Sequence, residues 1–63
     1  MKEREYAINT VIPALKEEKS EGFVHSAVGV CWGMDALKVA KTIEEYTDFK
    51  CVVCGGTVYV KMI

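Results

Sequence analysis

The chain has 63 residues, of which 51% are hydrophobic and 27% charged, with a formal net charge of −1 and a pI of about 5.7. One domain, 1–63, fits this length, and the apolar content excludes intrinsic disorder. No run approaches the roughly 18 apolar residues that span a bilayer, and the first ten residues lack the apolar stretch of a signal peptide. We therefore expect no membrane association and a cytoplasmic location.

The first expected element is a helix over residues 2–19. Its apolar side chains recur at three- and four-residue spacing and form one stripe: Ala7, Ile8, Val11, Ile12, Ala14 and Leu15. Pro13 lies inside this pattern, and we expect a kink there because proline removes one backbone hydrogen bond. Gly22 is the expected stop, since glycine accepts the left-handed conformation that often follows a helix.

Residues 22–34 carry no formally charged side chain, and two interpretations of them compete. As a strand, 23–32 would be bounded by Gly22 and Gly33 and rich in β-branched and aromatic residues. As a short helix, the segment would begin at Ser26 as N-cap and end at Gly33. Propensity favours the strand, because Val and Gly are poor helix formers.

Residues 35–46 are the clearest helix, with Asp35 as the expected N-cap. The expected apolar face consists of Leu37 (or Ala36), Val39, Ala40, Ile43 and Tyr46. Residues 49–62 then predict a β-hairpin, because two β-branched and aromatic runs flank Gly55-Gly56, a pair suited to a tight turn.

The stretch GMDALKV, residues 33–39, contains a glycine, an apolar residue, an N-cap and an apolar residue four positions after the cap. Together with LKEEKSEGFVHS before it and Gly29 four residues before Gly33, it resembles the winged helix-turn-helix family over residues 15–62. The resemblance implies a small winged-helix-like α+β domain: helix, short helix or strand, helix and C-terminal hairpin. Residues 26–32 would be the motif's second helix, 35–46 the recognition helix and 49–62 the wing. The alternative is an α/β arrangement whose three-stranded sheet uses 23–32 as a strand.

The function implied by this resemblance is that of a small transcription regulator, a homodimer that binds double-stranded DNA. The N-terminal half of the recognition helix would enter the major groove, with Lys50 and Lys61 adding phosphate contacts. The expected DNA-binding residues are Ala36, Leu37, Lys38, Lys41, Lys50 and Lys61. A protein-interaction or dimerisation module without DNA binding is the alternative, and the acidic pI favours it.

The dimer interface would use the uncharged segment 22–34 together with some of the aromatic residues, since small domains often hide excess apolar surface in this way. An enzyme is not expected. The sequence has no glycine-rich phosphate loop and no paired acidic motif, and no orienting carboxylate lies near His25 and Ser26 in sequence.

Three cysteines include a Cys-x-x-Cys pair, Cys51 and Cys54, which raises the possibility of a zinc site. Such a site needs about four ligands, and Cys31 and His25 are the further candidates; two chains could also share one metal. In an extended strand, however, residues three apart point to opposite faces. We therefore expect no cofactor, with a small zinc-binding domain as a second alternative.

Overall fold

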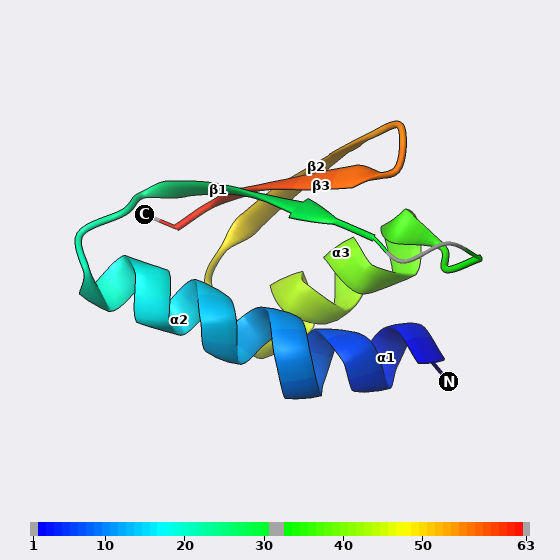
Figure 1. The fold of residues 1–63 in the computed structure, drawn as a ribbon, viewed down its shortest axis with the longest axis horizontal. Helices are drawn as coiled ribbons and strands as arrows, with labels where there is room; N and C mark the ends of the chain where they lie inside the picture. The colour runs from blue at the N-terminus through cyan, green and yellow to red at the C-terminus, as the bar shows by residue number, and fades with distance from the viewer. Residues whose placement is uncertain (1, 31–32, 63) are drawn as a thin grey trace.

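A computed structural model describes residues 2–30 and 33–62. The elements in chain order are α1 (Lys2–Tyr6), a π-helical turn η1 (Ala7–Val11), α2 (Ile12–Ser20), β1 (His25–Gly29), α3 (Ala36–Tyr46), β2 (Lys50–Cys54) and β3 (Thr57–Lys61). The strands form one antiparallel sheet in the order β1-β3-β2. The helices cover one face of this sheet and leave the other face open (Figure 1). The predicted α+β class is confirmed.

The first helix runs from α1 through η1 into α2. A kink was expected at Pro13, and the structure has a π-helical turn, Ala7–Val11, shortly before that residue. The amide of Ile12 donates to the carbonyl of Ala7, five residues back. Pro13, which has no amide proton, therefore follows a turn where the usual i→i−4 ladder is already interrupted.

The helix ends at Gly22, as predicted. Gly22 has a φ of 102° and its amide donates to Lys19 O at 3.0 Å, while the amide of Phe23 donates to Glu18 O at 3.1 Å. This pair of bonds is a Schellman motif, which requires the left-handed conformation that glycine adopts at low cost.

The resemblance implied a helix at residues 26–32. This prediction is wrong for residues 26–29, because the structure has a strand at His25–Gly29. Its partners are the residues of β3, with Ala27 opposite Tyr59 at the centre. The strand interpretation of 23–32 is confirmed for this stretch, while Cys31 and Trp32 lie outside the described residues. The helix-turn-helix motif thus lacks its second helix in the described chain before α3.

The N-cap and the hairpin are confirmed. Asp35 Oδ1 accepts from the amide of Leu37 at 3.0 Å at the start of α3. β2 and β3 are joined by Gly55-Gly56, and Gly55 has a φ of 62°, which a residue with a side chain adopts only with strain.

The core lies between the helices and the inner face of the sheet. The buried residues are Ala7, Val11, Ile12, Leu15, Ala36, Val39, Ala40, Ile43, Phe49, Val58, Val60 and Met62. Because side chains alternate along a strand, burying Val58 and Val60 of the central strand directs Thr57, Tyr59 and Lys61 to the open face.

Candidate functional site

The lysines expected on a recognition helix lie in a mixed-charge environment on α3. Lys38 and Lys41 are exposed and line a shallow pocket that also holds Glu3, Arg4 and Glu45. Arg4 Nη1 lies 3.8 Å from the carboxylate of Glu45. α1 therefore brings a second set of charges beside α3, and the two lysines do not form an uninterrupted basic surface.

The N-terminus of α3 is held by α1. Glu3 Oε2 accepts from the amide of Asp35 at 3.0 Å. That hydrogen bond is the main cause that lowers the pKa of Glu3, with a smaller contribution from the charge of Lys38. Ala36 is buried against the core and Leu37 is exposed, so only one of these two expected DNA contacts is accessible.

The open face of the sheet brings together side chains from all three strands. Cross-strand register arranges them in three rows: His25, Lys61 and Lys50; Ala27, Tyr59 and Val52; Gly29, Thr57 and Cys54. We call the first the basic row and the second the apolar row. The basic row unites Lys50 and Lys61, both expected as nucleic-acid contacts, with His25, which was expected only as a possible metal ligand.

Charge is strongly segregated between the sheet and the rest of the chain. None of the nine acidic residues lies in a strand, whereas the strands contain two lysines and the one histidine. Outside the strands, six Lys and Arg residues stand against nine Asp and Glu residues. The open face is therefore positive on a protein whose net charge is negative.

The apolar row is exposed next to these cations. Val52 is 66% exposed and Tyr59 is 50% exposed, and the two are direct cross-strand partners. An aromatic ring and a β-branched side chain at such exposure present an apolar surface that a ligand can cover. From the sequence, some of the aromatic residues were expected at a dimer interface, and none was assigned to this face. The pattern that indicates the face is the alternation of Lys50, Val52 and Cys54 on β2 and of Thr57, Tyr59 and Lys61 on β3.

The two cysteines of the Cys-x-x-Cys pair point to opposite faces of β2. Cys51 is half-buried against the core, its amide donates to Glu44 Oε2 at 2.9 Å, and Cys54 is exposed on the open face. Burial, with a smaller effect of the Glu44 charge, raises the pKa of the Cys51 thiol to about 11. Because the two side chains point to opposite faces of the strand, Cys51 and Cys54 of one chain do not converge on a shared zinc ion.

The other zinc candidates do not complete a site. His25 lies opposite Lys61, at the far end of the sheet from Cys54, which lies opposite Thr57. Cys31 lies outside the described residues. The described part of the chain contains no cluster of three or more His, Cys, Asp or Glu residues that could hold a metal ion.

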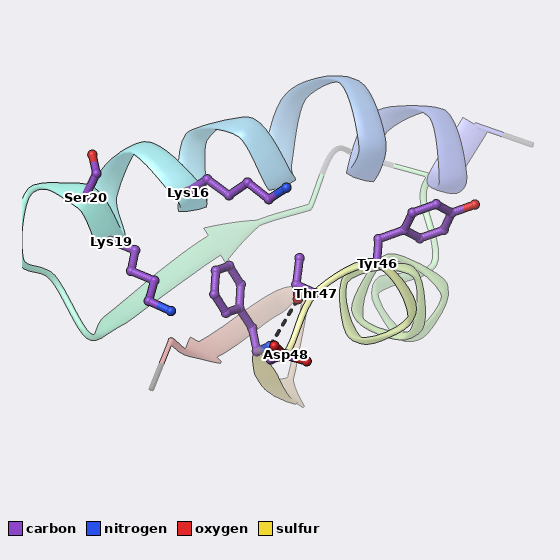
Figure 2. A pocket seen from close by; sticks show the side chains of 7 residues that line it. Lys16, Lys19, Ser20, Tyr46, Thr47 and Asp48 are labelled. Atoms are coloured by element: carbon purple, nitrogen blue, oxygen red, sulfur yellow. Dashed lines mark hydrogen bonds between the residues drawn. The ribbon is translucent and has the colours of Figure 1, made fainter.

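A surface pocket of about 530 Å³ lies between α2 and the loop that leads into β2. Figure 2 shows the side chain of Lys19 extending from α2. Its Nζ lies 5.5 Å from the centroid of the Phe49 ring. Thr47 Oγ1 accepts from the amide of Phe49 at 3.1 Å and fixes this loop. The lining combines Lys16 and Lys19 with Asp48, so the pocket has no single charge preference.

Among the described residues, no helix has the length and apolar character needed to cross a membrane. Comparisons with protein-family models, curated proteins and solved structures found no match for this chain.

Proposed function

We propose that this protein binds single-stranded nucleic acid on the open face of its sheet. The observation that carries the proposal is the basic row of His25, Lys61 and Lys50 beside exposed Tyr59, on strands without a carboxylate side chain. Proteins that bind single strands combine cations that contact the backbone with aromatic rings on which bases stack.

The spacing of the rows suits both contacts at once. Neighbouring strands lie about 4.8 Å apart, so the basic row spans about 10 Å. Tyr59 is two residues from Lys61 on the same strand, a separation of about 7 Å. Phosphates can therefore lie along the basic row while an unstacked base covers the Tyr59 ring.

Single-stranded nucleic acid is favoured over duplex DNA by the shape of the surface and by the surroundings of α3. Major-groove recognition requires a helix or a two-stranded ribbon that enters the groove. The basic row instead lies on a three-stranded sheet. Lys38 and Lys41 lie among the carboxylates of Glu3 and Glu45, which repel phosphate. Regulation of transcription through α3 stays a prediction from the sequence.

The expected energies are modest and measurable. A base stacked on an aromatic side chain contributes about 1–3 kcal/mol. Contact of two lysines with a single strand should give a salt slope, log K against log salt, of about −1.4, since each phosphate contact contributes about −0.7. Binding should therefore weaken with salt and with loss of the Tyr59 ring.

Fluorescence anisotropy with labelled mixed-sequence oligonucleotides tests the proposal. Single-stranded DNA, single-stranded RNA and duplex DNA are each titrated at low and moderate salt. Tyr59→Ala should weaken single-strand binding by about tenfold, which corresponds to about 1.4 kcal/mol of lost stacking, and Tyr59→Phe should retain it. Lys50→Ala/Lys61→Ala should reduce the salt slope by about 1.4.

The matched control is Lys38→Ala/Lys41→Ala, which removes the same charge from α3. It should leave single-strand binding nearly unchanged. Absence of single-strand binding at low salt by a chain shown to be folded would refute the proposal. Duplex binding lost only in the α3 control would also refute it, and would support the recognition-helix prediction instead.

A further inference from the structure

We propose that two copies of this chain pair through the outer edge of β1, so that their two sheets join into one continuous antiparallel sheet. This inference concerns assembly and does not depend on nucleic-acid binding. It rests on the hydrogen-bond pattern of β1, on the contrast between the two edges of the sheet, and on the symmetry of the pairing.

The hydrogen bonds at both ends of β1 define which backbone groups face outward. Val24 O accepts from the amide of Met62 at 2.8 Å, and the amide of Val30 donates to Gly56 O at 3.0 Å. In an antiparallel ladder the residues between them alternate, so the backbone groups of His25, Ala27 and Gly29 face away from β3. Among the described residues, β1 has no strand partner on that outer side.

The opposite edge of the sheet, along β2, is protected. The same alternation turns the backbone of Cys51 and Val53 outward, and the Cys51 amide is already bonded to the carboxylate of Glu44 at 2.9 Å. A carboxylate at a strand edge also repels the carbonyl oxygens of an incoming strand. Natural sheets use such devices against edge pairing, and at β1 the side-chain contact to an outward-facing backbone group lies at the end of the strand, on Gly29 O.

The outer edge of β1 carries one side-chain contact from the helical layer. The hydroxyl of Tyr6 donates to Gly29 O at 3.3 Å, at one end of the strand. A groove of about 260 Å³ runs between this edge and the first helix, with Thr10, Ala14 and Glu18 on the helix side. The helix side also includes Tyr6, Val11 and Leu15, so an added strand has space beside β1, next to mostly apolar side chains.

A second copy fits this edge because the pairing is self-complementary. A two-fold axis at Ala27 places each Ala27 opposite the same residue of the second copy and each His25 opposite Gly29. Every outward donor then meets an acceptor of the other copy, as an isologous interface requires. Residues 22–34 contain no formally charged side chain, so no like charges meet across the axis.

Two further features agree with a covered edge. Phe23 and Val24, directly before β1, are 56% and 42% exposed, an apolar surface at the end of the proposed interface. Pairing at Ala27 would also join the apolar rows of both sheets. The two Tyr59 rings would then lie three strand spacings apart, about 14 Å, on one face.

Sedimentation velocity across a concentration series tests the pairing, with one variant and one matched control on the same row. Ala27→Lys places two lysines directly opposite each other and should raise the dimer dissociation constant by about tenfold or more. Val52→Lys adds the same charge to the same face on the protected edge strand and should leave the dimer intact. The wild type should reach twice its chain mass of 7.0 kDa.

Ala27→Pro supplies a second, independent variant. It removes only an outward-facing amide, so the bonds between β1 and β3 remain and circular dichroism should report a folded chain, while the dimer is lost. Amide hydrogen exchange gives the local readout. Protection of the Ala27 amide should rise with protein concentration, whereas that of the Val53 amide should not.

A wild type that stays monomeric at millimolar concentration would overturn the proposal. So would a dimer that survives both Ala27 variants, since it would then use another surface. Single-strand binding by a monomeric chain would leave the proposed function standing, so the two proposals can fail separately.

Discussion

The orientation of α3 can be tested by comparing two aliphatic residues on its opposite sides. Ile43 has no exposed surface and packs in the core, whereas Leu37 is 58% exposed. The hydrophobic pattern alone accepted either Leu37 or Ala36 as the inward residue. Truncating Ile43 should therefore destabilise the fold much more than truncating Leu37.

The magnitudes follow from burial. Ile43→Val removes one buried methylene and should cost about 1 kcal/mol, and Ile43→Ala should cost about 2–5 kcal/mol. A domain of this size is expected to have an unfolding free energy of roughly 3–9 kcal/mol, so Ile43→Ala removes a large fraction of it. Leu37→Ala should change the unfolding free energy by less than about 0.5 kcal/mol, because it alters an exposed surface position.

Urea denaturation followed by far-ultraviolet circular dichroism measures these differences. With a slope of about 1 kcal/mol per molar urea, Ile43→Val should lower the midpoint by about 1 M. All variants are compared at one protein concentration, since association would couple to unfolding. A Leu37→Ala variant that is as unstable as Ile43→Val, or more so, would refute the assigned orientation of α3.

Two further predictions concern the cap of α3 and the thiol of β2. Asp35→Ala should lower the unfolding free energy by about 0.5–2 kcal/mol in the same urea assay, because the Leu37 amide loses its acceptor. Asp35→Asn should change the unfolding free energy little, since asparagine is also a good N-cap. Equal losses in the two variants would contradict the assigned cap. The thiol of Cys51 can be tested by alkylation with iodoacetamide at mildly alkaline pH, followed by mass spectrometry. The reaction should be about a hundredfold slower in the folded chain than in urea, because a pKa raised from 9.0 to about 11 lowers the thiolate fraction by that factor. Because the thiol ionises at a lower pH in the unfolded chain, the contribution of Cys51 to stability is complete below pH 9.0 and should be lost as the pH rises toward 11. The Cys51→Ala variant should not show this pH dependence. Equal alkylation rates in the folded and unfolded states would rule out the raised pKa.

Local elements of the fold were predictable because their stabilising contacts lie within a few residues. The stop at Gly22, the N-cap at Asp35 and the turn at Gly55 each depend on hydrogen bonds or φ angles of neighbouring residues. Such features are present in the sequence pattern before any tertiary contact forms. The same holds for the first helix, whose apolar stripe identified four residues of the core: Ala7, Val11, Ile12 and Leu15.

Features that depend on distant partners could not be predicted in the same way. Residues 23–32 suited a strand or a short helix, and a strand is stable only once β3 supplies its ladder. Lys38 and Lys41 looked like a basic helix face until α1 placed Glu3 and Arg4 beside them. Both outcomes were decided by segments at least 28 residues away in the chain.

The candidate site shows the same division. The sequence by itself determined that Lys50, Val52 and Cys54 share one face of a strand, since side chains alternate with a period of two. Only the tertiary structure decided that His25, Lys61 and Lys50 form one row, because that row depends on the register of β3 against both neighbours. A shift of one residue in either register would turn the side chains to opposite faces, and the buried side of the sheet fixes the register against it.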